Sequence, residues 1–418
     1  MFTPNTSPAV RSRPGTVDVR DVQRGERGDR YFVAVAVFAA CSPTYLPPHV
    51  SALGLVAVLF GWMVVRAVRW NQSFWDVPNL PTLLLLLLAG LSLFWSGNVG
   101  ASTYSLLGLY AYTVIAIHCA TLLPARVFID GFAAGMKLFL AASIAAFFLL
   151  PSVAIVHGDY ETGAFQGLAY HRNYMAYIAA LSALTFQWKL MNGGRLPRLV
   201  AWWAVSVACL VATASVTSIT LFVLWSVLLS VVSWLSSRRS IWTAGLLLVF
   251  SLSAAGAYLV WSNLDAATQA LGRDPTLTGR TEIWRVVWQL VESNFWFGYG
   301  WNAWALGNPV GDSLRSALGF NVTHAHNGYL NVALELGIVG LALLVWLLVL
   351  LLVKSLSRVA HKNAFLWMFV VIGMIVSASM AENRAFLNLG WFLIVAIGLY
   401  VGRRRSVERP TNASEGTR

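Results

Sequence analysis

The stretch between Glu335 and Lys354 contains only apolar residues and glycine. A helix needs about 20 mostly apolar residues to cross the hydrocarbon core of a bilayer. Comparable runs recur along the 418-residue chain, in which 58% of the residues are hydrophobic and only 11% are charged. A soluble domain carries about 25% charged residues. The chain is therefore predicted to be an all-α integral membrane protein with lipid as its main solvent.

About twelve segments are long and apolar enough to span a membrane. The first is the weakest, because Ser42, Pro43, Pro47 and Pro48 interrupt it. The expected spans are 31–47, 50–68, 80–96, 101–122, 127–151, 173–190, 199–214, 217–236, 241–262, 332–353, 363–380 and 385–402. This predicts a mostly disordered polar tail at 1–30, nine spanning helices within 31–262, and a large extracytoplasmic loop with short helices at 263–325. Three further helices follow at 326–402, and a second tail at 403–418.

Lysine and arginine are unevenly distributed between the two sides of these spans. If both tails are cytoplasmic, most basic residues are too, as the positive-inside rule requires. The net charge of +12 then reflects membrane topology, and no nucleic-acid partner is expected. The basic residues left on the outer side are Arg172, Arg273, Arg280, Arg285, Arg315 and Arg384. Arginine is disfavoured on that side, so these positions indicate a functional need.

One helix is recognisable inside the large loop. Thr281 can cap it, and Glu282 in its first turn favours the helix dipole. Its apolar face is formed by Ile283, Trp284, Val287, Trp288 and Val291. Two interpretations remain open: this face lies on the membrane surface, or it packs on a core within the loop.

The densest polar cluster runs from His324 to Leu330, where the large loop enters the tenth predicted helix. Asn327, Asn331 and Glu335 follow at four-residue spacing and share one helix face. Polar groups at membrane depth tend to face a cavity or a partner. The histidines can anchor the helix as a hydrogen-bonded pair, hold a metal, or act on a substrate.

Three weaker clusters lie at the same membrane face. His171-Arg172-Asn173 ends a glycine-rich stretch, where the arginine can also be a snorkelling side chain. Glu382-Asn383-Arg384 is interpreted as an exposed turn with a local ion pair. The hydroxyls between Thr213 and Thr220 are expected to bond to their own helix backbone. Together, arginines and histidines at one face suit a pyrophosphate-linked substrate, because the guanidinium fork binds phosphate and a neutral histidine can accept a proton.

These motifs resemble the O-antigen ligase and O-antigen polymerase superfamily. The stretch His-Ala-His-Asn-Gly-Tyr-Leu, with Glu-Leu-Gly-Ile-Val-Gly before a leucine-rich span, is similar to its signature. Gly-Arg-Thr-Glu-Ile-Trp and Phe-Gly-Tyr-Gly resemble its large-loop pattern, and His171-Arg172-Asn173 resembles its earlier motif. The resemblance covers roughly 160–385. The chain departs from it near 213–220, where many relatives carry Ser-Arg and this chain has Ser218-Ile219.

The resemblance implies a glycosyltransferase in the bacterial inner membrane, with both termini cytoplasmic and the active site on the outer face. It would move a glycan from undecaprenyl pyrophosphate to the hydroxyl of a glycan or lipid-linked acceptor, with inversion and without a metal or other cofactor. His326 matches the catalytic base, with His324 as a second candidate. Arg280 and Arg172 match the pyrophosphate-binding residues. Supporting roles fall to Asn327, His171, Glu335 and Trp284.

Two other functions fit parts of the pattern. A metal-dependent relative with a lipid monophosphate donor typically has acidic residues in the first outer loop, and 43–49 has none, although Asp159 and Glu161 lie in a later loop. A transporter or flippase of a lipid-linked glycan suits the helix number, but such proteins usually show repeated halves and broken helices near mid-membrane. We find no repeat, and the polar clusters gather at one face.

Overall fold

The computed structural model describes residues 19–42, 57, 60–64, 77–157, 163–194, 196–236, 280–359, 363–386 and 388–403. All its longer elements in these ranges are helices, as predicted. Most of the expected spans at 50–68 and 241–262, the start of the large loop and the ends of both tails lie outside the described residues. Helix α1 (Val19–Cys41) begins inside the expected polar tail, so the last twelve residues assigned to that tail, about three turns, are helical.

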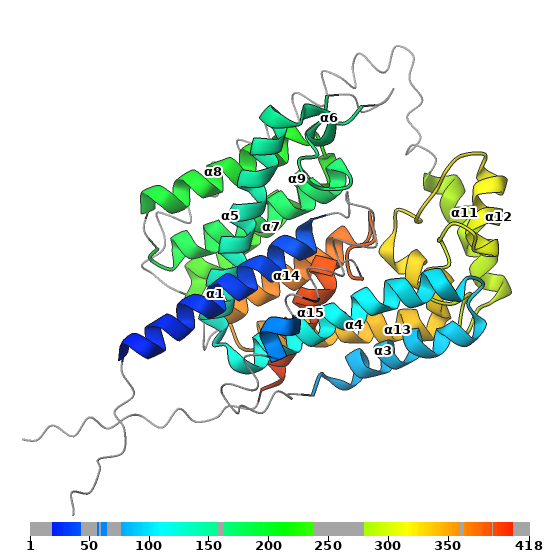
Figure 1. Ribbon diagram of the computed structural model, residues 1–418, viewed down its shortest axis with the longest axis horizontal. Helices are drawn as coiled ribbons and strands as arrows, with labels where there is room; N and C mark the ends of the chain where they lie inside the picture. Colours follow the sequence, from blue (N-terminus) through cyan, green and yellow to red (C-terminus); the bar gives the residue numbers. More distant parts are fainter. Residues whose placement is uncertain are drawn as a thin grey trace, which may run out of the picture.

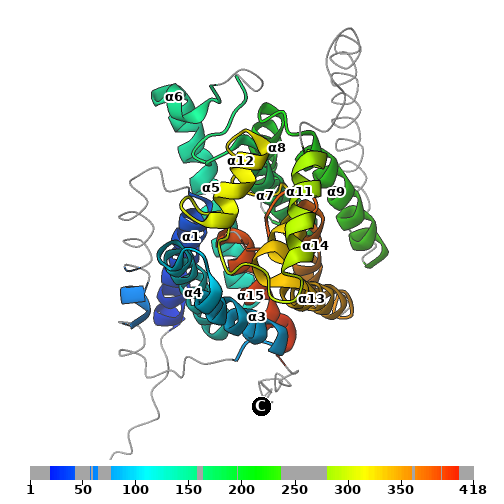
Figure 2. The same ribbon diagram turned by 90° about the vertical axis from the view of Figure 1, so that its right-hand side faces the viewer.

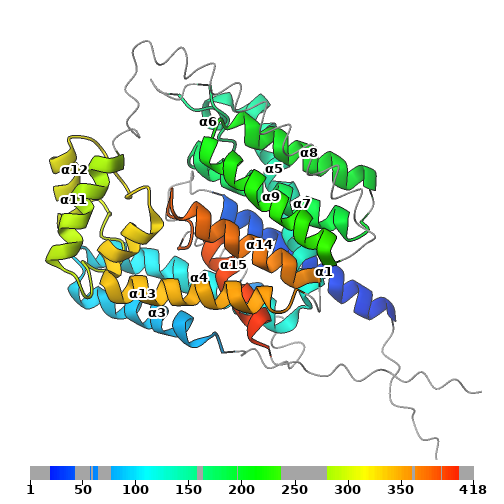
Figure 3. The ribbon, with the colours of Figure 1, turned by 180° about the vertical axis from the view of Figure 1, so that it is seen from behind.

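The helices run roughly parallel in one bundle (Figure 1). On one side lie α3 (Leu80–Leu91), α4 (Val99–Leu122) and α13 (Gly328–Leu356). On the other lie α5 (Ala125–Leu149), α7 (Arg172–Met191), α8 (Leu196–Ala212) and α9 (Val216–Ser236). Helices α1, α14 (Asn363–Ala378) and α15 (Asn388–Gly402) lie between the two groups, as the view from behind also shows (Figure 3). The short elements are η1 (Ser92–Trp95) and α6 (Pro151–Ala154).

Four of the described helices are long and apolar enough to cross a membrane: Val99–Leu122, Ala125–Leu149, Val216–Leu235 and Gly328–Leu356. The apolar helices Leu80–Trp95, Leu196–Ala212, Asn363–Ala378 and Asn388–Gly402 are shorter. Buried apolar side chains join the helices into one core, which includes Phe128, Trp367 and Trp391. A membrane bundle is thus supported, and the number of twelve spans stays a prediction.

The large loop forms a small helical cap over one end of the bundle. Helices α11 (Arg280–Ser293) and α12 (Pro309–Leu318) lie beyond the ends of α3, α4 and α13 (Figures 1 and 2). Ile283, Val287 and Val291 of α11 are buried against Leu314 and Val322. Of the two interpretations of this helix, the structure supports packing on a core of the loop, although Trp288 stays 45% exposed.

A break in α13 attaches this cap to the bundle. Gly337 has φ of 66°, which opens the helix and frees backbone groups on either side. The segment 295–300 fills the gap: Tyr299 and Gly300 donate N–H bonds of 2.9 Å to the carbonyls of Leu334 and Glu335. The backbones approach so closely that a Cβ at Gly337 would lie 2.2 Å from the Trp296 carbonyl oxygen. The Phe-Gly-Tyr-Gly motif at 297–300 therefore forms backbone hydrogen bonds at the Glu-Leu-Gly motif, 335–337.

We predict that Gly337→Ala destabilises the protein more than Gly319→Ala. Both glycines have positive φ, 66° and 73°, but a Cβ at Gly319 would meet open space. Gly319 has the left-handed helical conformation, which costs a residue with a Cβ roughly 1–2 kcal/mol. Gly337, with ψ of −169°, lies in a region that is essentially restricted to glycine, and a Cβ there adds a backbone clash. The measurement is the thermal unfolding midpoint of the purified full-length variants. Equal midpoints would show that the junction between the loop and α13 does not need this close approach.

Candidate functional site

The segment from His324 to Asn327 crosses from the helical cap to the start of α13. Trp284 of α11 donates from Nε1 to the Ala325 carbonyl at 2.8 Å, and Asn331 of α13 accepts the Ala325 N–H at 2.7 Å. Asn327 caps α13 by accepting from the N–H groups of Tyr329 and Leu330. The backbone hydrogen bonds of Ala325, which lies between the two histidines, thus fix the position of both. Asn327 and Trp284, two of the predicted supporting residues, contact the segment that carries the histidines.

Both histidine side chains meet the carboxylate of Glu382, in the turn between α14 and α15. His324 Nε2 lies 2.9 Å from Glu382 Oε2, and His326 Nδ1 lies 3.2 Å from Oε1. Asn173 of α7 donates from Nδ2 to Oε1 at 3.0 Å, and Arg280 Nη2 lies 3.6 Å from the same oxygen. The Glu382 carboxylate therefore joins three separate segments of the chain.

Glu382 is an ionised acceptor in this arrangement. Burial alone raises the pKa of its carboxyl, but the hydrogen bonds from His324 and His326 and the charge of Arg384 outweigh burial and hold the pKa well below its usual range. An ionised carboxylate can only accept hydrogen bonds. The two histidine nitrogens that face Glu382 must therefore carry protons.

This assignment gives the two histidines different chemistry. With Nε2 protonated, a neutral His324 presents Nδ1 as an acceptor, and the Thr323 hydroxyl lies 3.1 Å from it. With Nδ1 protonated, a neutral His326 presents an unprotonated Nε2. That nitrogen has no hydrogen-bond partner among the described residues, and the His326 side chain is 28% exposed. His326 can thus accept a proton from a bound molecule, whereas the acceptor nitrogen of His324 is already in use.

The interpretation of Glu382-Asn383-Arg384 as an exposed turn was wrong. Glu382 is 8% exposed and Arg384 is 3% exposed. Arg384 donates from Nη1 to the Tyr170 hydroxyl at 3.3 Å, and its guanidinium lies 5.2 Å and 5.4 Å from the ring centres of Tyr174 and Tyr177. These partners are far away in the sequence, so the local pattern alone could not reveal them.

Arg172 and His171 lie beside the cluster. Arg172 donates from Nη1 to the carbonyls of Thr213 and Ala214, at 3.2 and 3.0 Å. His171 caps α7 by accepting the Asn173 N–H at Nδ1. The segment therefore delivers Asn173 to Glu382 and places Arg172 at the turn between α8 and α9. The expected local bonding of the hydroxyls near 213 is confirmed for Thr213, which donates to the Leu210 carbonyl.

Glu335 supports a different part of the protein. Its carboxyl group is buried near the backbone of Asn302, and its backbone carbonyl accepts the N–H of Gly300, on the segment that fills the break in α13. It lies eight residues beyond Asn327, about 12 Å along the helix. Among the described contacts, Glu335 thus stabilises the loop junction rather than touching the histidines.

The ligand atoms of His324, His326 and Glu382 lie within 4.8 Å of one another, close enough to share a metal ion. A metal there would have to displace the protons assigned to the two histidine nitrogens, and it would lie close to the Arg280 guanidinium, which is 3.6 Å from Glu382 Oε1. A cation placed among them would be repelled by the arginine charge.

The comparisons with known proteins bear on this arrangement. Residues 199–345 match the family model for O-Antigen ligase. The predicted resemblance to the O-antigen ligase and polymerase superfamily is confirmed. The O-antigen ligase match includes Arg280, His324 and His326 and ends before Glu382. Asn173 and Arg172 precede it.

A curated relative is the exopolysaccharide production protein ExoQ of Rhizobium meliloti (strain 1021). It is 31% identical over 122 residues, which are 28% of this chain and 27% of that protein. The similarity thus covers less than a third of either chain. It supports the resemblance to the superfamily and leaves activity and substrates to be argued from the site.

We predict that Glu382→Gln lowers the free energy of unfolding by about 1–3 kcal/mol at neutral pH, because it removes a buried charged acceptor from several donors. The pKa of Glu382 is lowered on folding, so its stabilisation is present above the unfolded value of about 4.3 and is lost as pH falls below it. The difference between wild type and variant should therefore shrink in acid.

The measurement is chemical unfolding of the purified protein at neutral pH and below pH 4. Glu282→Gln is a matched control, because Glu282 is exposed and bonds only to Arg285 of its own helix among the described contacts. A Glu382 variant as stable as this control would contradict the role of Glu382 as the common acceptor.

Proposed function

We propose that this protein is a membrane glycosyltransferase that moves a glycan from undecaprenyl pyrophosphate to an acceptor hydroxyl in surface polysaccharide assembly. The observation that carries the proposal is the His326–Glu382 pair beside Arg280. A base oriented by a buried carboxylate, next to a permanent cation, suits an acceptor hydroxyl and a phosphate leaving group.

The reaction is a single displacement at the anomeric carbon of the donor sugar. The acceptor hydroxyl loses its proton to His326 Nε2 as its oxygen forms the new glycosidic bond. The bond between the anomeric carbon and the pyrophosphate oxygen breaks, and its electron pair leaves with the phosphate. Attack opposite to the leaving group inverts the configuration. Glu382 keeps the proton of His326 on Nδ1 and stabilises the imidazolium that forms.

Arg280 is proposed to bind the departing pyrophosphate. It begins α11, where unpaired backbone N–H groups add a positive potential. Arg172 is the second proposed phosphate contact, supported by its position next to Asn173, which bonds to Glu382. Two cations are suitable because leaving-group charge develops in a site of low dielectric constant.

We propose a polymerase, whose acceptor is a second lipid-linked repeat unit. The name of the matched relative refers to exopolysaccharide production, and the family model is that of O-Antigen ligase, so a ligase is the second candidate. The active site would lie at the outer face of the bacterial inner membrane, with both termini cytoplasmic, as the distribution of basic residues predicts.

We expect His326→Ala to reduce glycan transfer by about 10²–10⁴-fold, the usual contribution of a general base. His324→Ala should cost less, because His324 holds Glu382 without presenting a free basic nitrogen. The assay follows the release of undecaprenyl pyrophosphate from a purified lipid-linked glycan by full-length protein in vesicles, with insertion checked. Wild-type transfer by His326→Ala would exclude it as the base. If wild-type protein moves the glycan across the vesicle membrane and releases no carrier, the protein is a transporter.

We also expect transfer to be unaffected by chelators, because the arginine opposes a cation at the His324, His326 and Glu382 cluster. The wild-type rate is measured with and without EDTA, and then after addition of Mg²⁺, Mn²⁺ or Zn²⁺. Loss of activity in EDTA that one of these ions restores would replace the proposed mechanism with a metal-dependent one.

A further inference from the structure

A cavity lies at the opposite end of α13 from the histidines. It has a volume of about 450 Å³ and lies between the start of α3 and the last turns of α13 and α15. α13 has 29 residues, which corresponds to roughly 40 Å between its ends. Figure 3 shows α13 extending from the helical cap to this end of the bundle. The cavity is thus separate from the proposed glycan site.

The α13 wall of this cavity changes from apolar to charged along the helix. Trp346, Leu350 and Lys354 are four residues apart and so share one face, with about 6 Å between successive positions. Lys354 lies in the last turn of α13. Trp346 lies deeper in the span and is 45% exposed. This order matches a lipid, with a charged group at the membrane surface and a hydrocarbon chain below it.

The charged end of the cavity is cationic. Lys354 and Arg403 line it, and none of the other described lining residues carries a charge. Arg403 is held in position because it donates from Nη2 to the Ala120 carbonyl, and its guanidinium lies 5.4 Å from the centre of the Tyr400 ring. Cations also favour helix C-termini for electrostatic reasons. The helix dipole alone does not explain why both cations face the same cavity. Basic pockets between transmembrane helices on the cytoplasmic side bind anionic lipid headgroups.

Two glycines of α15 line the cavity, and one of them, Gly402, faces open space. Gly398 and Gly402 are one turn apart, and both line the cavity. A Cβ on Gly402 would meet no atom within 4 Å, so a larger side chain there would occupy the cavity without displacing the protein. Asn79, which caps α3, adds a polar group at the opening.

We propose that this cavity binds an anionic phospholipid of the leaflet on the Lys354 side. The phosphate lies between Lys354 and Arg403, and one acyl chain runs along Leu350 and Trp346. The lipid would fix the ends of α3, α13 and α15 relative to one another. The proposal does not depend on the glycan-transfer reaction at the other end of the bundle.

The test is lipid binding to the delipidated full-length protein in detergent, measured by native mass spectrometry. Phosphatidylglycerol, phosphatidylcholine and inorganic phosphate are titrated separately. The variants are Lys354→Gln with Arg403→Gln, which removes the charge, and Gly402→Phe, which fills the cavity. Arg198→Gln is the control, because Arg198 is an exposed residue of α8 that does not line the cavity. Thermal unfolding verifies that each variant is folded.

We expect wild type to bind phosphatidylglycerol more tightly than phosphatidylcholine. Loss of both cations should weaken phosphatidylglycerol binding by on the order of tenfold or more. Gly402→Phe should weaken binding of both lipids, and Arg198→Gln should leave it unchanged. Wild-type binding by both cavity variants overturns the proposal, as does equal binding of the two lipids by wild type. Saturation by inorganic phosphate at the lipid concentrations would identify a soluble anion as the ligand instead. If the double variant fails to fold, Gly402→Phe decides.

Discussion

A buried, ionised carboxylate needs hydrogen-bond donors around it. The donors that Glu382 needs bring together the segments of the proposed active site. Leaving an ionised carboxylate unpaired at the end of an apolar bundle would be costly. Glu382 obtains its donors from the start of α7, from α11 and from the loop before α13. These segments must be close together for the carboxylate to be ionised. The same contacts that stabilise the charge therefore define which nitrogen of His326 is basic.

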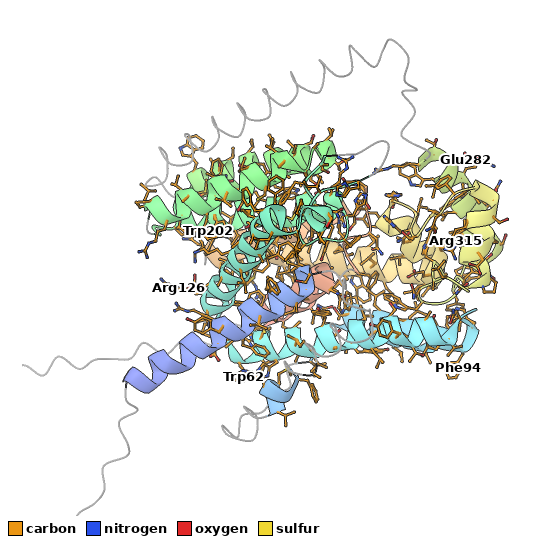
Figure 4. All side chains as sticks on the ribbon, turned by 45° about the horizontal axis from the view of Figure 1, so that its top comes forward. Trp62, Phe94, Arg126, Trp202, Glu282 and Arg315 are labelled. Carbon is orange, nitrogen blue, oxygen red and sulfur yellow. The ribbon has the colours of Figure 1, made fainter. Side chains whose placement is uncertain are left out.

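The large loop can supply two of these segments because it is attached at two places. At one, the broken turn of α13 bonds to residues 295–300. At the other, Trp301 donates to Ser92 of η1 and to Ser105 of α4. The cap of α11 and α12 is thus fixed to three helices of the bundle (Figure 4 places Glu282, Arg315 and Phe94 at this end, away from Arg126). Arg280 and His326 can then have defined positions although they lie on a loop.

The sequence predicted most of the described spans to within a few residues, because apolar length and basic flanks are local properties. It also predicted the apolar face of α11. The roles expected for His326 and Arg280 stay predictions, and the structure places both side chains beside Glu382 Oε1. The sequence could not predict Glu382, because a Glu-Asn-Arg turn has the same local pattern whether exposed or buried. Its burial depends on Asn173 and the tyrosines of α7, more than 200 positions away. The break at Gly337 was missed for a related reason, since Gly-Ile-Val-Gly within an apolar run is typical of an unbroken span.

The family match covers only part of the proposed active site. The matched segment 199–345 holds His326, the proposed base, and Arg280, whereas Glu382, which accepts from His326, lies outside it. A His326 without Glu382 would have no fixed tautomer, and its Nε2 would be protonated for part of the time. Such a nitrogen cannot accept a proton from a hydroxyl. The matched segment therefore contains the proposed reacting groups, and the contact of the α14–α15 turn with α7 holds Glu382 where it fixes the proposed tautomer of His326.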